Sequence, residues 1–257
     1  MADPVVYLER DGDIAVITFD RPPLNAIDEQ LLTELAGAVD DLAADLSVRA
    51  VLLRSALDGV FMAGADITEF ERIGSEGLDR ANAGQEVVNR LAELPQPTVA
   101  AINGHALGGG LEVALACDFR FLADAEGALI GLPEVRLGLL PGAGGTQRLT
   151  ALVGPGRATE LIMKGLQLTP RQAYADGIVH DLVPPDELDE KTRDYTVRLA
   201  RQAPIALRGI KRAIRAAGTP EGFRTEADAF REVLASEDAQ AGVSAFLNGE
   251  RAAFSVS

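Results

Sequence analysis

Short apolar runs alternate with helical patterns over most of the chain. Val5–Glu9 and Ile14–Phe19 are rich in β-branched and aromatic residues and flank the turn residues 11–13, which predicts a β-hairpin. Asp28 is a favourable N-cap, and the apolar residues between Leu31 and Leu42 recur at helical spacing. Because strand and helix patterns alternate up to about residue 185, the sequence predicts an α/β fold with a largely parallel sheet.

The remaining elements of this region follow the same patterns less regularly. We expect strands at 49–54, 98–103 and 118–122 and helices at 85–94 and 111–116, with a glycine-rich turn at 104–110. Residues 74–85 are rich in Gly, Ser, Asp and Asn, a composition that predicts a loop or an irregular helix.

The C-terminal part of the chain has a helical pattern from Pro184 onward. Apolar residues gather on one face of each of two segments, which contain Phe223, Ala227, Phe230, Val233 and Leu234, and Val243, Phe246 and Leu247. We therefore predict a core at 1–200 and a helical region at 201–257. Because that region is too small to bury a large core of its own, it should pack on the first part or on a neighbouring subunit.

Composition and charge narrow the class of protein. The 257 residues include 24 Lys and Arg against 39 Asp and Glu, and a net charge of −15 disfavours nucleic-acid binding. One cysteine, Cys117, permits no internal disulfide bond and no CxxC zinc site, and we expect it to be structural, like His105 and His180. No secretory signal and no apolar run of membrane-spanning length is visible, so we expect a cytoplasmic protein.

Carboxylates are the most plausible acids and bases in this chain, which has two histidines and no HExxH, GxSxG or GxxxxGK[ST] motif. Glu112 follows a cluster of glycines at 108–110, and Glu134 follows Pro133. Two carboxylates beside glycine-rich turns suit general acid–base catalysis if the fold brings them together. Spacing alone leaves open that one or both are simply solvated.

Two segments of small residues offer backbone N–H groups. Gly108–Gly110 opens a predicted helix without the spacing of a GxGxxG motif, so it either presents N–H groups to an anion or merely allows tight packing. The second segment, 63–65, has the same two interpretations. Local physics favours the structural one, because Asp66 and Glu69 would form a helix capping box.

Four segments carry the most distinctive motifs of the chain. They are RPPLNAI at 21–27, FMAGADI at 61–67, NGHALGGGLE at 103–112 with CD at 117–118, and GLPEVRLGLLPGAGGTQRL at 131–149. In this order they resemble the crotonase (enoyl-CoA hydratase/isomerase) family over nearly the whole chain. The resemblance implies a spiral of ββα units and a helical C-terminal region that serves oligomerisation, as a trimer or a dimer of trimers, and covers the active site.

The resemblance also implies roles for single residues. The thioester carbonyl of an acyl-CoA would be polarised by the backbone N–H groups of Ala63 and Gly109, an oxyanion hole. Glu112 would help activate a water for attack at Cβ, and Glu134 would deliver a proton to Cα. Glutamates at both positions favour an enoyl-CoA hydratase of fatty-acid β-oxidation that needs no metal or other cofactor besides the CoA of its substrate. The stretch implied to bind CoA is Ala63, Gly64, Ala65, Asp66 and Ile67.

Two other functions stay open, and two departures from the family pattern bear on the site. A Δ3,Δ2-enoyl-CoA isomerase could work with Glu134 alone, and a non-catalytic acyl-CoA-binding member is the second alternative. The stretch from Asp118 to Glu134 is slightly longer than is typical, and residues 248–251 lack the basic run that the family often has. A second basic stretch contains Arg201, Arg208, Lys211, Arg212 and Arg215. It either supplies the missing positive charge, near the CoA phosphates or at a subunit interface, or it is a solvated face.

Overall fold

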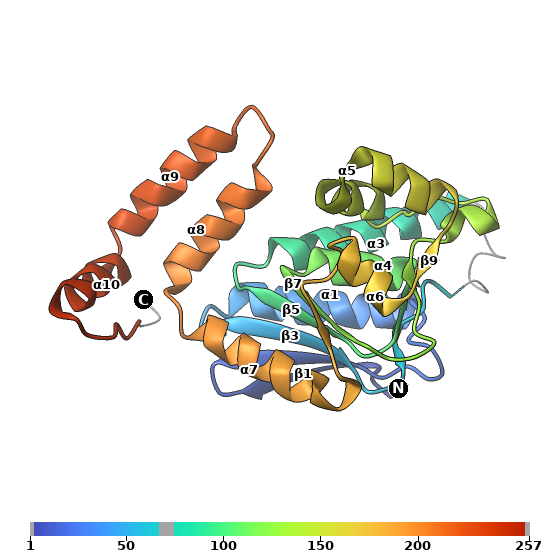
Figure 1. The fold of residues 1–257 in the computed structure, drawn as a ribbon, viewed down its shortest axis with the longest axis horizontal. Coiled ribbons are helices and arrows are strands. Elements are labelled where there is room, and N and C mark those ends of the chain that lie inside the picture. Colours follow the sequence, from blue (N-terminus) through green and yellow to red (C-terminus); the bar gives the residue numbers. More distant parts are fainter. Residues whose placement is uncertain (1–2, 67–74, 255–257) are drawn as a thin grey trace.

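A largely parallel sheet with the strand order β1-β2-β3-β5-β7-β10 lies at the centre of the molecule (Figure 1). The structure is a computed structural model, and it describes residues 3–66 and 75–254. The predicted hairpin is the antiparallel pair β1–β2, and the following neighbours in this sheet are parallel. A smaller sheet has the order β4-β6-β8-β9. The predicted α/β fold is therefore confirmed.

The strands are β1 (Val6–Asp11), β2 (Ile14–Phe19), β3 (Ala50–Ser55), β4 (Val60–Met62), β5 (Thr98–Ile102), β6 (His105–Leu107), β7 (Phe119–Ala123), β8 (Ile130–Gly131), β9 (Gln167–Leu168) and β10 (Asp181–Val183). The helices before the C-terminal region are α1 (Glu29–Ala44), α3 (Ser75–Glu93), α4 (Gly109–Ala116), the 3₁₀ helix η1 (Glu134–Leu137), α5 (Gly145–Met163, kinked at Gly154), α6 (Pro170–Ala175) and the 3₁₀ helix η2 (Pro185–Glu187). The last four are α7 (Leu188–Ala200), α8 (Pro204–Arg215), α9 (Gly222–Leu234) and α10 (Glu237–Asn248).

Successive strand pairs and helices repeat as ββα units. In β3–β4–α3, β5–β6–α4 and β7–β8–α5, the first strand joins the large sheet and the second joins the small one. Each unit therefore turns a corner between its two strands. In this spiral α4 lies against β4 and β6, and described residues that follow β4, β6 and β8 come together, at Ala65, Gly108–Gly109 and Glu134.

Two predicted elements differ from the structure. The segment 104–110 is not a simple turn, because it contains the strand β6, which pairs in parallel with β4 and β8. Of the two possibilities expected at 74–85, the loop is wrong from Ser75 onward, where the regular helix α3 begins. The second half of α3 is anchored on the core by the buried side chains of Val87, Val88 and Leu91. Extending such an established helix by one residue costs far less free energy than starting a new one, so the helix also includes the residues from Ser75.

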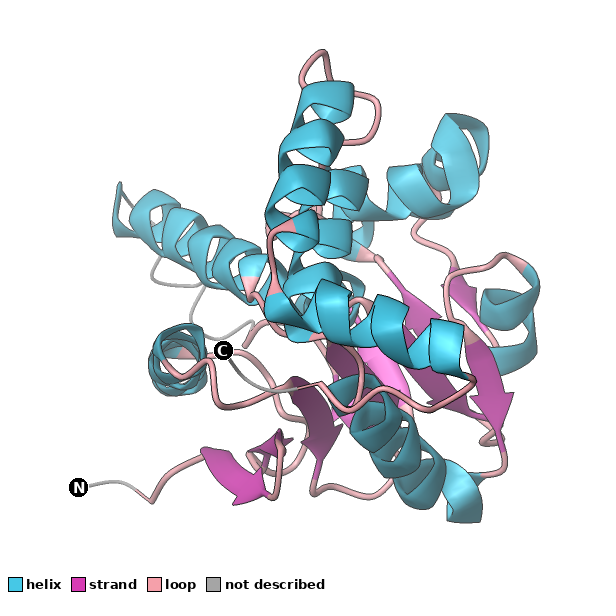
Figure 2. Cartoon of the chain, turned by 90° about the vertical axis from the view of Figure 1, so that its left-hand side faces the viewer, coloured by secondary structure: helices cyan, strands magenta, loops and turns pink. Residues whose placement is uncertain are grey.

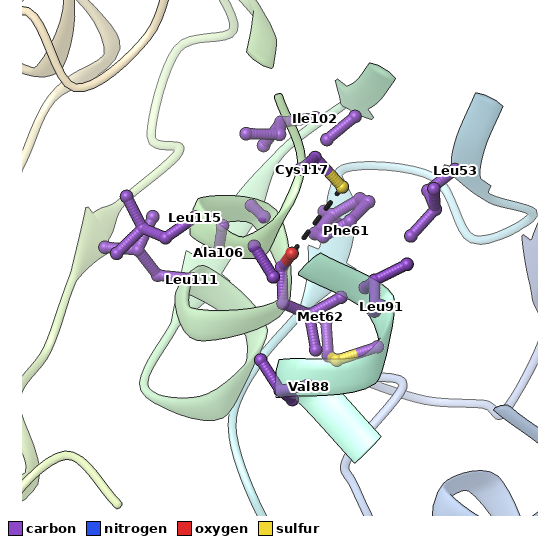
Figure 3. Close-up of a cluster of buried hydrophobic side chains, with 14 of the residues drawn as sticks. Leu53, Phe61, Met62, Val88, Leu91, Ile102, Ala106, Leu111, Leu115 and Cys117 are labelled. Carbon is purple, nitrogen blue, oxygen red and sulfur yellow. Dashed lines mark hydrogen bonds between the residues drawn. The ribbon is translucent and has the colours of Figure 1, made fainter. Parts of the chain in front are cut away.

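The two faces of the large sheet bury different apolar clusters. Along β2, Ala15, Ile17 and Phe19 face α1, α3 and α4, whereas Ile14 and Val16 face α7, as the period of two in a strand requires. Figure 3 shows part of the first cluster, in which the β4 residues Phe61 and Met62 lie among side chains of α3 and α4. The Phe61 ring also packs edge-on against Phe19, with centroids 5.9 Å apart.

The last three helices project away from the sheets. In Figure 1, α8, α9 and α10 stand to one side of the core, and Figure 2, seen from that side, shows them in front of it. The apolar face predicted for this region is exposed on the single chain: Phe223 is 90% exposed and Phe246 is 84% exposed. None of the helices in the described ranges is both long enough and apolar enough to cross a membrane.

A buried ion pair holds α8 on the core. Lys211 Nζ lies 2.6 Å from Asp118 Oδ2 and also donates to the Gln96 carbonyl oxygen at 2.9 Å. The same Asp118 oxygen accepts from the backbone N–H and the hydroxyl of Thr98 at 2.8 and 3.1 Å. Burial lowers the pKa of Lys211, and the charge of Asp118 opposes that shift. Lys211 is therefore paired within the chain, which corrects the expectation of a solvated face for this residue. Arg212 pairs with Glu232 of α9 at 2.6 Å.

This ion pair gives a stability test. Lys211→Met should lower the free energy of unfolding by about 2–4 kcal/mol, because it leaves the Asp118 charge without its main partner. Urea unfolding followed by circular dichroism at one fixed protein concentration measures the change. The control Lys191→Met removes an exposed pair with Glu187 and should have no measurable effect. Equal losses in both variants would contradict the assignment.

Candidate functional site

The segment between β2 and α1 is held in place by one buried amide. The Asn25 side chain accepts from the Arg21 backbone N–H at 2.7 Å and donates to Ser55 Oγ at 2.8 Å and to the Phe61 carbonyl oxygen at 2.9 Å. Asn25 is fully buried and has a positive φ of 50°, a region that Asn tolerates better than most residues. It therefore ties the RPPLNAI segment to the ends of β3 and β4.

The segment after β4 pairs with this RPPLNAI backbone. The Ile27 N–H donates to the Gly64 carbonyl oxygen at 2.8 Å, and the Asp66 N–H donates to the Ile27 carbonyl oxygen at 2.9 Å. These two hydrogen bonds form a parallel bridge between Ile27 and Ala65. Ala65 lies between the two bonded residues of its segment, so its own N–H points away from Ile27. The exposed Ala65 therefore directs its N–H to the other side.

The predicted donor Ala63 is engaged elsewhere. Its N–H donates to the Leu24 carbonyl oxygen at 3.0 Å, so it is not available to a ligand in this conformation. The assignment of an oxyanion-hole donor to Ala63 is therefore corrected. Asp66 forms an ion pair with Arg21 at 3.1 Å. Ile67, the last residue of the predicted CoA-binding stretch, lies outside the described residues, as does the capping partner Glu69.

The triple glycine makes close contact with the other segments of the site. A β-carbon on Gly110 would lie 2.0 Å from the Met62 carbonyl oxygen, so only glycine fits there. A β-carbon on Gly109 would lie 4.0 Å from the Ala65 backbone nitrogen, and one on Gly108 would lie 3.2 Å from Glu134 Oε1. Gly109 is also the first residue of α4, where the N–H has no acceptor within the helix.

Glu112 is a buried carboxylate that backbone N–H groups hold. It lies in the first turn of α4 and is 3% exposed, and its Oε1 accepts from the N–H groups of Ala143 and Gly145 at 2.7 and 2.8 Å. Burial raises the pKa of Glu112, and these two hydrogen bonds and the charge of Arg148 oppose the shift. The side chain is therefore held through Oε1 by two backbone N–H groups of the loop before α5.

Glu134 occupies a different environment a short distance away. It begins the helix η1, and its Oε2 is buried and has no hydrogen-bond partner among the described residues. Burial raises the pKa of Glu134 to about 7, with a smaller contribution from the charge of Glu112. Glu134 is therefore the carboxyl group of this site that can gain or lose a proton close to neutral pH.

The two histidines and the cysteine have structural surroundings. His105 Nδ1 accepts from the Leu129 N–H at 3.2 Å. His180 Nδ1 accepts from the Arg120 N–H at 3.1 Å, and burial lowers the pKa of His180 to about 4, so it stays neutral at ordinary pH. Burial raises the pKa of Cys117 to about 12, and its thiol contacts the Val113 carbonyl oxygen (Figure 3).

The structure thus joins most of the predicted site. Glu112, Glu134 and Gly109 come together beside Ala65, and Ala63 supports the backbone behind them. Sequence reasoning named Ala65 only as part of the CoA-binding stretch and gave no role to Arg148 or to the Ala143–Gly145 backbone. The PGAGGTQR motif was the available signal, because two glycines before a helix allow a turn whose N–H groups converge.

Comparisons with known proteins identify the family of the chain. The sequence profile of the enoyl-CoA hydratase/isomerase family matches residues 9–256. A short-chain-enoyl-CoA hydratase of Clostridium acetobutylicum is 37% identical over 94% of both chains. A crotonyl-CoA hydratase of Syntrophomonas wolfei is 36% identical over 99% of both.

Solved structures show the same fold. The crystal structure of an enoyl-CoA hydratase from Bacillus anthracis superposes with a TM-score of 0.92 and 34% identity, over 98% of this chain and 100% of that one. The predicted spiral of ββα units with a helical C-terminal region is therefore confirmed. With a profile that matches nearly the whole sequence and relatives of this similarity, the chain belongs to the enoyl-CoA hydratase/isomerase (crotonase) family.

Proposed function

We propose that the protein is an enoyl-CoA hydratase, which adds water to a trans-2-enoyl-CoA and gives a 3-hydroxyacyl-CoA. The observation that carries the proposal is the buried carboxyl group of Glu112 together with the half-buried Glu134, beside the Gly108–Gly110 turn. A hydration needs one group to orient and activate water and one to supply a proton. The names of the relatives support the same reaction.

The two carboxyl groups divide the proton transfers. Glu112 is held through Oε1 by two N–H groups, so its Oε2 is the atom that would orient the attacking water at Cβ. Glu134, with a pKa of about 7, would carry the proton that is delivered to Cα. Because two N–H groups hold Glu112 in place and Glu134 exchanges its proton near neutral pH, each has a distinct task.

Two backbone N–H groups would polarise the thioester carbonyl. In place of Ala63, the proposal assigns the donors to Ala65 and Gly109, whose backbones lie side by side. A fixed donor of this kind contributes about 3–4 kcal/mol to the stability of an enolate-like transition state. The rest of the predicted CoA-binding stretch, Gly64 and Asp66 with Ile67, would hold the adjoining part of the thioester. The proposed reaction uses no metal and no other cofactor, and we place it in fatty-acid β-oxidation in the cytoplasm.

We further propose that the 201–257 region serves oligomerisation and active-site cover in a trimer or a dimer of trimers. The apolar side chains of α9 and α10 support this, because Phe230, Leu234, Phe246 and Leu247 are 58–84% exposed on the single chain. Apolar faces of this size are usually covered by another subunit.

The first prediction concerns the two carboxyl groups. Glu112→Gln and Glu134→Gln should each lower kcat for crotonyl-CoA hydration by about 10²–10⁴-fold, because each amide can neither accept nor supply the proton. Loss of the enoyl-thioester absorbance measures the rate, and the exposed Glu187→Gln is the control. Ordinary turnover in both variants would exclude the mechanism. If Glu112→Gln kept full activity in shifting the double bond of a 3-enoyl-CoA while it lost hydration, the isomerase reaction would also belong to this site.

The pKa of Glu134 predicts the pH dependence. Because Glu134 must be protonated to supply a proton, kcat/KM for hydration should fall above pH about 7, by about tenfold per pH unit. On the acid side kcat/KM should fall as Glu112 becomes protonated. The profile is measured between pH 5 and 9 at constant ionic strength. The residual activity of Glu134→Gln should lack the alkaline decline; an unchanged decline would assign it to another group.

Light scattering after gel filtration tests the assembly. We expect a mass of three or six times the 27.1 kDa of the chain. Phe230→Glu combined with Phe246→Glu should shift the mass toward that of one chain, because it places charges on the exposed apolar faces. The control Leu46→Glu, at an exposed apolar residue of the core, should leave the mass unchanged. A wild-type protein of 27.1 kDa would refute the proposal.

A further inference from the structure

Arg148 lies behind the site and has no part in the reaction proposed above. It is in the first two turns of α5, where its Nη1 donates to the Ala143 carbonyl oxygen and its Nη2 to Asn89 Oδ1, both at 2.7 Å. Ala143 is one of the residues whose N–H binds Glu112. Arg148 therefore holds the carbonyl oxygen of the residue that holds the carboxylate.

The loop between η1 and α5 is shaped around this guanidinium. Gly144 has a positive φ of 100°, and a β-carbon there would lie 2.1 Å from Arg148 Nη1. A side chain at Gly144 would therefore displace the guanidinium, which packs directly on the backbone of the loop. On either side of Gly144, the N–H groups of Ala143 and Gly145 converge on Glu112 Oε1.

A second hydrogen bond ties the same loop to α3. Gln85 Nε2 donates to the Gly142 carbonyl oxygen at 3.0 Å, one helical turn before Asn89, which accepts from Arg148. Because residues four apart share a face of a helix, Gln85 and Asn89 together anchor the loop and Arg148 on α3. The position of the loop is therefore fixed by side chains from two helices.

The positive charge of Arg148 also acts on the ionisation of Glu112. Among the described groups, Arg148 favours the ionised form of Glu112, and the charges of Glu112 and Glu134 oppose each other. Burial lowers the pKa of Arg148, which the charge of Glu112 opposes; Arg215 adds to the lowering and Glu93 opposes it. The charge of the buried Glu112 thus offsets part of the desolvation cost of the half-buried Arg148 guanidinium.

We propose that Arg148 is a positioning residue, which holds the Ala143–Gly145 loop in the one shape in which both of its N–H groups bind Glu112. It touches neither the substrate nor the reacting atoms. The proposal rests on the proposed function only in that Glu112 is taken as the group that activates water. It predicts that Arg148 acts on kcat and on the ionisation of Glu112 rather than on substrate affinity.

The test compares Arg148→Met and Arg148→Lys with Arg157→Met, a control on the same helix that loses an ion pair with Asp176. In Arg148→Met we expect kcat for crotonyl-CoA hydration to fall about tenfold to a hundredfold, with KM changed less than about twofold, because a misplaced group slows the reaction more than it weakens binding. In Arg148→Lys the charge remains but the two-pronged contact is lost, so kcat should recover in part. Arg157→Met should match the wild type.

A second readout does not depend on turnover. The carboxyl carbon of Glu112, labelled with ¹³C and assigned through Glu112→Gln, should titrate at a higher pH in Arg148→Met than in the wild type, because a favourable charge is gone. In Arg148→Lys the midpoint should move less. Asn89→Ala keeps the charge and removes one anchor, so it should lower kcat without the full shift of the midpoint.

The outcomes separate the two proposals. A wild-type kcat and a wild-type Glu112 midpoint in a folded Arg148→Met variant would overturn the positioning role. If Arg148→Met does not fold by circular dichroism, Arg148→Gln decides the question with the same two measurements. If the wild type hydrates no enoyl-CoA, the proposed function fails, whereas the titration of Glu112 still decides whether Arg148 positions it.

Discussion

The candidate site depends on one close approach between two backbones. Gly110 lies so near the Met62 carbonyl oxygen that any β-carbon would collide with it, and this contact sets how the start of α4 meets the end of β4. From it follow the neighbouring positions of Gly109 and Ala65 and the contact of Gly108 with Glu134. The ββα repeat supplies the elements, but the absence of side chains at the triple glycine lets them meet.

The acidity of the chain does not conflict with an anionic ligand, because the site relies on main-chain dipoles. The chain carries a net charge of −15, yet the N–H groups of Ala143 and Gly145 bind Glu112, and the donors proposed for the thioester are the N–H groups of Ala65 and Gly109. Fixed dipoles act over a few ångströms, whereas net charge acts at long range and is screened by salt. Local geometry therefore governs what binds here.

Patterns along the chain predicted the large sheet and the helices that cover it, because the β-branched and aromatic run of β2 and the helical spacing after Asp28 follow directly from burial. Glu112 and Glu134 could be named from motifs. The strand β6 could not be predicted, since a strand of three residues is too short to show a periodic pattern. The choice between Ala63 and Ala65 depends on which way each N–H points, and that direction is set by pairing with the distant residues Leu24 and Ile27.

Cys117 gives the core a built-in chemical reporter. It is the one cysteine of the chain, it is buried where α4 ends, and its raised pKa keeps it as an unreactive thiol. The next residue, Asp118, anchors α8 through Lys211. A thiol reagent can therefore label the folded protein only when the apolar cluster around the end of α4 opens, so the labelling rate measures how often that part of the core opens.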